Sequence, residues 1–186
     1  MRVIGGRFGG TRLATPKSRA TRPTSDRVRE SLFNILSHGM DLSFDGVRVL
    51  DLFAGTGALG FEALSRGAAF ALFVDTEADA RALIRENIER TATGGVTKVF
   101  RRDAMSLGPA GTISAFDLCF LDPPYGMGSG EKALASAHAG GWLRDDALCV
   151  LEEDSRVEVK IPEHFDLWDQ RRTGDTNVYF LRYRRN

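Results

Sequence analysis

The chain has 186 residues, of which 42 % are hydrophobic and 27 % charged, and its 25 Lys and Arg balance 25 Asp and Glu. This length suits one domain with an appendage and is short for two full domains. With neither a membrane-length apolar run nor a signal-peptide pattern, we expect a cytoplasmic globular protein. Cys119 and Cys149 lie in apolar runs, where they are best interpreted as small core residues, and we predict no metal site.

The zero net charge hides a separation of charge along the chain. Residues 1–30 carry eight Lys and Arg against two acids (+6), residues 171–186 carry five against one (+4), and residues 31–170 carry twelve against twenty-two (−10). Solvated arginines at chain ends are common, but those of the first stretch alternate with Gly, Thr and Ser, a composition suited to phosphate contacts. We therefore predict that nucleic acid is bound by Arg2, Arg7, Arg12, Arg19 and Arg22.

The first 46 residues are predicted to form a basic extension. The Gly-rich stretch 2–16 indicates a β-hairpin, and residues 24–36 indicate a helix capped by Thr24 or Ser25. The apolar face of that helix comprises Val28, Leu32, Ile35 and Leu36. We expect the helix to dock on the main domain, residues 47–186.

From residue 47 onward, short apolar runs alternate with amphipathic stretches. Strands are predicted at 47–53, 69–75, 96–103, 116–122 and 147–154, and helices at 56–67, 77–91 and about 130–139. Strands that are apolar throughout indicate an α/β fold with a mainly parallel sheet covered on both faces. Residues 164–184 are two period-2 runs around "TGDT", which predicts a β-hairpin that adds an antiparallel strand.

A glycine pattern follows the first strand of this domain. In "LDLFAGTGALG", Gly55, Gly57 and Gly60 match G-x-G-x-x-G between a strand and a helix, a weak signal by itself. Asp75 lies twenty residues after Gly55 at the end of the second strand, where a carboxylate can accept hydrogen bonds from both ribose hydroxyls. Both a nicotinamide dinucleotide and S-adenosylmethionine fit this crevice.

Asp51 favours the second cofactor. A pyrophosphate at the glycine loop would bring its negative charge close to this acid, four residues before Gly55, whereas S-adenosylmethionine presents a cationic sulfonium and an ammonium. Asp103 follows the third strand, where it can accept a hydrogen bond from the adenine amino group. Any one of these acids could be a solvated loop carboxylate, but three at successive strand ends indicate a ligand site.

The fourth strand ends in "FLDPPYG", residues 120–126. Two consecutive prolines fix two φ angles and remove two backbone donors, so the turn is rigid. Asp122 and the Pro123 carbonyl can each accept one N–H of an exocyclic base amine and direct its lone pair at the sulfonium methyl, while Tyr125 stacks on the base. Alone, D-P-P is usually a structural turn; after an apolar strand, with the glycine loop and its acids, it indicates catalysis.

These motifs carry a family resemblance. "LDLFAGTGALG" followed by "LDPPYG" resembles the amino-methyltransferases of the Rossmann-like S-adenosylmethionine fold, and "RVIGGRFGGTRL" with "TRPTSDRVRESLFNIL" is similar to the RsmD family of small-subunit ribosomal RNA guanine-N2 methyltransferases. The resemblance runs from about residue 2 to the last strand and implies a seven-stranded sheet. It implies ribosomal RNA, naked or in an assembled particle, as substrate, and we expect a monomer.

The resemblance also implies roles for individual residues. The target amine is assigned to Asp122, Pro123, Pro124 and Tyr125. S-adenosylmethionine is assigned to Asp51, Phe53, Ala54, Gly55, Thr56, Gly57, Asp75, Thr76, Asp103 and Ala104, with Thr24 and Asp26 closing over its methionine end.

Other functions remain open on the motifs alone. The same turn serves adenine-N6, cytosine-N4, guanine-N2 and glutamine-amide methylation. A DNA or RNA adenine-N6 methyltransferase is the nearest alternative, although the short chain leaves little room for a DNA target-recognition domain. A second alternative is an inactive nucleotide-binding RNA chaperone, but the intact Asp122 argues against it. A nicotinamide oxidoreductase ranks lowest.

Overall fold

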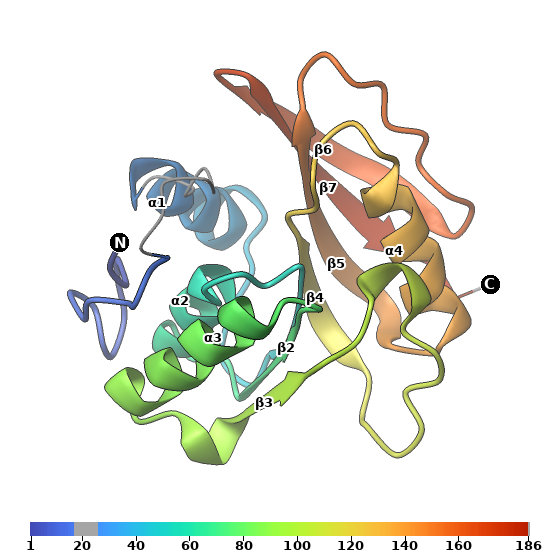
Figure 1. Ribbon diagram of the computed structural model, residues 1–186. Coiled ribbons are helices and arrows are strands. Elements are labelled where there is room, and N and C mark those ends of the chain that lie inside the picture. Colours follow the sequence, from blue (N-terminus) through green and yellow to red (C-terminus); the bar gives the residue numbers. More distant parts are fainter. Residues whose placement is uncertain (17–25, 186) are drawn as a thin grey trace.

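The computed structural model describes residues 1–16 and 26–185, built around a single seven-stranded sheet (Figure 1). The strands are β1 (Arg48–Leu52), β2 (Phe70–Val74), β3 (Thr97–Phe100), β4 (Phe116–Leu121), β5 (Leu143–Asp154), β6 (Phe165–Thr173) and β7 (Thr176–Tyr183). Their order is β3-β2-β1-β4-β5-β7-β6. The first five are parallel, and β7 pairs antiparallel with both β5 and β6. The predicted fold class is therefore confirmed.

Helices cover both faces of this sheet (Figure 1). One face carries α1 (Asp26–Asn34), α2 (Ala58–Ser65) and α3 (Ala78–Thr91), and α1 continues as a π-helix (Ile35–Gly39). The other face carries α4 (Ser129–Ala139), which lies beside the 3-10 turn Ala104–Ser106. A second 3-10 turn, Gly94–Val96, precedes β3. No helix within the described ranges is both long and apolar enough to cross a membrane.

The two faces bury separate apolar cores, as expected for strands that are apolar on both sides. Phe33 of α1, Phe61 of α2 and Phe120 of β4 belong to the first core. The second contains Trp142 and both cysteines, which are buried free thiols as predicted. The sheet therefore lies between two apolar layers, and polar side chains within the strands stand out as exceptions.

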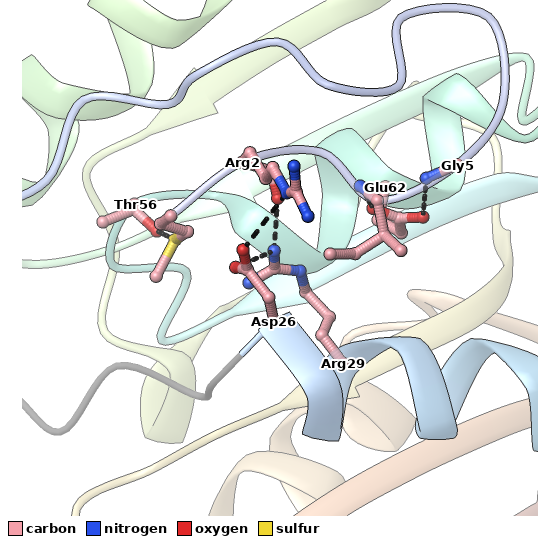
Figure 2. Close-up of polar contacts among 8 residues, drawn as sticks. Arg2, Gly5, Asp26, Arg29, Thr56 and Glu62 are labelled. Atoms are coloured by element: carbon pink, nitrogen blue, oxygen red, sulfur yellow. Dashed lines mark hydrogen bonds and ion pairs between the residues drawn. The ribbon is translucent and has the colours of Figure 1, made fainter.

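The N-terminal hairpin is shorter than predicted. Its only ladder pairing among the described residues is an isolated antiparallel bridge between Arg2 and Arg12. Backbone N–H groups of Val3 and Leu13 also donate across the hairpin, to the carbonyls of Thr11 (3.0 Å) and Met1 (3.2 Å). The segment is held by α2 as well, because the Glu62 carboxylate accepts hydrogen bonds from the backbone N–H groups of Ile4 (2.7 Å) and Gly5 (3.0 Å), as Figure 2 shows for Gly5. At Gly6, where φ is +76°, a Cβ would come within 2.0 Å of the Ser65 carbonyl oxygen. Glycine there allows the segment to approach α2 closely.

The buried face of the first helix differs from the predicted one. It is described from Asp26, so the proposed caps Thr24 and Ser25 lie outside the described residues. Leu32 and Leu36 are buried as expected, Val28 and Ile35 are half-buried, and Phe33 and Arg29 are buried in addition. Arg29 is accommodated because its guanidinium donates to the Arg2 carbonyl and lies 3.0 Å from the Asp26 carboxylate (Figure 2).

Candidate active site

The glycine loop links β1 to α2 and contains three residues with a left-handed backbone conformation. Phe53 (φ +56°), Gly55 (φ +56°) and Gly57 (φ +77°) all have positive φ, and the Gly57 N–H donates to the Ala54 carbonyl at 2.7 Å. Gly57 is also the N-terminal cap of α2. A positive φ is unfavourable for a residue with a Cβ, so Phe53 is a strained position of the kind that concentrates at ligand sites.

The glycines of this loop serve different purposes. At Gly60 a Cβ would lie 2.4 Å from the Phe73 ring, and the Gly60 N–H donates to Oδ2 of Asp51 at 3.0 Å. Gly60 is therefore needed for packing within the core. At Gly55 the nearest atom to a Cβ would be 4.0 Å away. This position borders open space, so the loop backbone can be approached closely by a ligand.

Acidic side chains follow β2 and β3, the two strands on one side of β1 in the sheet. Asp75, after β2, accepts hydrogen bonds from the backbone N–H of Gly55 to Oδ2 (2.9 Å) and from that of Glu77 to Oδ1 (2.9 Å). Asp103, after β3, is exposed and accepts from the Met105 N–H at 2.8 Å. Since β3, β2 and β1 are consecutive in the sheet, these acids and Asp51 line one edge. Of the flanking residues, Thr76 is exposed and Ala104 is buried.

Asp51 lies at the most buried point of this edge, with 2 % of its surface exposed. Burial raises its pKa well above the ordinary value; the hydrogen bond from Gly60 opposes this shift, and the charges of Asp122 and Asp75 add to it. The structure thus brings Asp51 of β1 within electrostatic reach of Asp122 in the D-P-P-Y turn. Carboxylates crowded in this way are stabilised by a cationic ligand.

The D-P-P-Y turn leaves the sheet directly after β4. Burial raises the pKa of Asp122 to about 6, and the charge of Glu153 contributes. Pro123 is buried, Pro124 is exposed and Tyr125 is half-buried. The two prolines cannot donate hydrogen bonds, and the turn is instead fastened at Gly126, whose N–H donates to Oε1 of Glu153 at 3.0 Å.

Glu152 and Glu153 are candidate site residues that were not predicted from the sequence. Both are almost fully buried at the end of β5, next to β4. Burial, together with the charge of Asp122, raises the pKa of Glu152 to about 8. A signal for them was present, because "ALCVLEED" ends an apolar strand in two acids just as the earlier strands end in Asp75 and Asp103.

Asn87 of α3 was not predicted either. Its Oδ1 accepts from the Ala14 N–H (2.6 Å), and its Nδ2 donates to the Thr56 carbonyl (3.0 Å). One buried amide thereby ties the N-terminal segment to the glycine loop. Nothing in the helical pattern around residue 87 distinguishes it from a surface polar residue, so periodicity alone could not have found it.

The predicted RNA-binding and closing residues are only partly described. Arg2, Arg7 and Arg12 are exposed, and Arg2 lies 3.6 Å from the Asp26 carboxylate. Asp26 is engaged with both Arg2 and Arg29 (Figure 2). Thr24, Arg19 and Arg22 lie outside the described residues.

The strand order, the glycine loop and the acids at neighbouring strand ends define the class of Rossmann-like methyltransferases. The family model described as "Conserved hypothetical protein 95" matches residues 1–182. The chain is 41 % identical over 165 residues to "Ribosomal RNA small subunit methyltransferase D" of Escherichia coli, covering 87 % of this chain and 78 % of the relative. This chain therefore belongs to the RsmD family.

Two further comparisons cover nearly all of the chain. The protein of the same name from Haemophilus influenzae is 32 % identical over 176 residues, covering 94 % of this chain and 89 % of the relative. The solved structure of yhhF from Escherichia coli superposes with a TM-score of 0.84 at 30 % identity, covering 100 % of this chain and 99 % of that one. The likeness includes the N-terminal segment as well as the sheet.

Proposed function

We propose that this protein transfers a methyl group from S-adenosylmethionine to the exocyclic N2 amine of a guanine in small-subunit ribosomal RNA. The substrate class is supported by the names of relatives such as that of Escherichia coli, a "Ribosomal RNA small subunit methyltransferase D". The observation that carries the chemistry is the position of Asp122, a half-buried residue directly after β4 that lies within electrostatic reach of Asp51 beside the glycine loop.

The residues present fit the methyl donor. Gly55 leaves open space over the loop, Asp75 offers a carboxylate for the ribose, and the raised pKa of the buried Asp51 marks a position that a cation would stabilise. Asp103, which is exposed after β3, can accept a hydrogen bond from the adenine amine. When bound, S-adenosylmethionine supplies an electrophilic methyl group on a sulfonium.

Asp122 and Pro123 then act on the base. The methyl group that the bound donor supplies would replace one proton on the amine nitrogen, and that proton would pass to the Asp122 carboxylate, which accepts an N–H of the amine. Accepting both N–H bonds orients the nitrogen lone pair before the step, which lowers the barrier by positioning and preorganised electrostatics. Tyr125 is proposed to stack on the base, and residues 1–46 to form an extension that carries RNA phosphates to the domain of residues 47–186.

The test is a product analysis. The protein is incubated with labelled methyl donor and hypomethylated small-subunit ribosomal RNA, or with particles that contain it, and the modified nucleoside is identified by chromatography. N2-methylguanosine is the expected product. N6-methyladenosine would favour the adenine alternative, and absence of transfer to either substrate, with the donor bound, would favour an RNA-binding protein without activity.

A further inference from the structure

Glu152 occupies a position beside the D-P-P-Y turn that the proposed chemistry does not yet use. The last registered pair between β4 and β5 is Leu121 with Leu151, so Asp122 and Glu152 each follow that pair by one residue. Residues in register on parallel strands share a face of the sheet. The preceding residues on this face, Phe120 and Val150, both belong to the core under α1 and α2. Glu152 is thus the lateral neighbour of Asp122.

The Glu152 carboxyl is buried without a hydrogen bond at Oε1. The residue is 4 % exposed, and Oε1 has no partner in the part of the chain that the structure describes. Glu153, the next residue, shows the contrast, since its Oε1 accepts from the N–H groups of Gly126 and Asp154. Burying a polar group without a partner costs free energy, and such groups in folded proteins require an explanation.

We propose that Glu152 is a further contact to the target base, and that its carboxyl hydrogen-bonds the base edge next to the amine that Asp122 and Pro123 hold. This inference rests on the proposed function. The edge of every amine-bearing nucleobase places donors beside acceptors, and a carboxyl group matches such an edge with two oxygens. A base in the site would therefore satisfy the group that the free protein leaves unsatisfied.

The charge of the site agrees with this role. Because its pKa is raised to about 8 by burial and by Asp122, Glu152 keeps its proton at neutral pH while Asp122, with a pKa of about 6, is ionised. A protonated carboxyl both donates and accepts a hydrogen bond, whereas the Asp122 carboxylate only accepts. The two neighbours thus offer different hydrogen bonds to one base.

Two substitutions test the contact. Glu152→Leu removes both hydrogen-bonding atoms at similar volume, and Glu152→Gln keeps a neutral group that donates and accepts. Asp145→Asn is the matched control, because Asp145 is an exposed acid near the other end of the same strand, about 23 Å away at the rise of a β-strand. Single-turnover methyl transfer, RNA affinity in the presence of S-adenosylhomocysteine, methyl-donor affinity and the melting temperature are measured for all three.

Glu152→Leu should lower the single-turnover rate at subsaturating RNA by about 10- to 100-fold, the effect of removing one substrate hydrogen bond, and should weaken RNA binding in the presence of S-adenosylhomocysteine. Glu152→Gln should stay within about fivefold of the unsubstituted protein, because an amide makes the same kind of contact. Donor affinity should not change. The melting temperature of Glu152→Leu should be equal or higher, since an unpartnered buried acid is removed.

Two results would overturn the inference. One is a Glu152→Leu protein that binds and methylates RNA as the unsubstituted protein does. The other is a Glu152→Leu protein whose activity, donor affinity and melting temperature all fall together, which would identify Glu152 as a structural residue. Failure of the proposed function is distinguishable, because it would be seen in the unsubstituted protein as the absence of N2-methylguanosine.

Discussion

Oδ2 of Asp75 accepts a hydrogen bond from the backbone N–H of Gly55 at 2.9 Å. The bond joins the end of β2 to the glycine loop that follows β1, so the acid predicted to bind a ribose also holds the loop on which the ligand would lie. Its other oxygen accepts from the N–H of Glu77 at the start of α3. Asp75 therefore holds the glycine loop and the start of α3 together, and we expect a ligand on its carboxylate to stabilise both.

Replacing Asp75 should weaken binding of the methyl donor. Asp75→Ala removes the charge-assisted acceptor, and the affinity for S-adenosylmethionine should fall by about 1.5 to 3 kcal/mol in isothermal titration calorimetry. Asp75→Asn keeps an oxygen that can accept a hydrogen bond from Gly55. Its affinity for S-adenosylmethionine should therefore lie between those of Asp75→Ala and the unsubstituted protein. The control is Asp79→Ala, an exposed acid in the first turn of α3. Unchanged affinity in a folded Asp75→Ala protein would refute the ribose assignment.

Substitutions in the D-P-P-Y turn should separate positioning from binding. Asp122→Ala should lose orders of magnitude in the single-turnover rate, because orientation and a preorganised acceptor each lower the barrier by several kcal/mol. Its affinity for the methyl donor should change little. An Asp122→Ala protein that methylates at the normal rate would show that the carboxylate does not hold the amine.

Tyr125 should contribute through its ring. Tyr125→Phe keeps the stacking surface and should retain most activity, whereas Tyr125→Ala should lose about 1 to 3 kcal/mol of base stacking. Single-turnover rates at saturating methyl donor compare the two variants. If Tyr125→Phe were as inactive as Tyr125→Ala, the hydroxyl rather than the ring would be the functional group.

The transfer rate should depend on the protonation of Asp122. Its pKa of about 6 means that the carboxylate is ionised at pH 7 and becomes protonated as the pH falls through 6, where it loses an acceptor for the amine N–H. Single-turnover rates should therefore decline below about pH 6, and Asp122→Asn should remove that decline while lowering the rate throughout. A profile that stays level down to pH 5 would contradict this dependence.

The same raised pKa values predict how stability varies with pH. Folding raises the pKa of Asp122 from 3.8 to about 6 and that of Glu152 from 4.5 to about 8, so the folded state binds protons more tightly than the unfolded state. The free energy of unfolding should therefore fall as pH rises from about 4 to 8. Urea denaturation at pH 5.5 and pH 8 measures the difference, which Glu152→Gln should reduce and the distant Asp145→Asn should not.

The exposed arginines of the N-terminal segment should contribute to RNA affinity through phosphates. Replacing Arg7 and Arg12 by Ala should reduce the slope of log affinity against log salt concentration by about 0.7 to 0.9 for each phosphate that the protein no longer binds. Binding of the methyl donor should not change. The comparison protein carries Arg171→Ala and Arg172→Ala together, both on β6. If the salt dependence changed only in this second variant, the RNA-binding surface would lie on the C-terminal hairpin.

Much of the domain could be predicted because its signals are local. Apolar strands alternating with helices, the hairpin around "TGDT" and an acid after each strand are readable from neighbouring residues, and the structure contains these elements within a few residues of the predicted bounds. The helix predicted at 56–67 spans 58–65, and the strand predicted at 96–103 spans 97–100. The glycine loop was likewise identifiable because its spacing is short.

Tertiary structure alone decided which of these elements are neighbours. Asn87 forms hydrogen bonds with Ala14 and Thr56, at separations of 73 and 31 residues. Arg29 can be buried because its guanidinium donates to the Arg2 carbonyl and pairs with the Asp26 carboxylate. Glu152 stands beside Asp122 because the chain crosses from β4 to β5 in a particular register. Hydrophobic periodicity shows which face of a strand is buried, but it carries no information about which strand lies alongside or in what register. Asp51, Asp75 and Asp122 were therefore foreseen as single acids, whereas the grouping of Asp51, Glu152 and Glu153 around Asp122 was set by the order and register of the sheet.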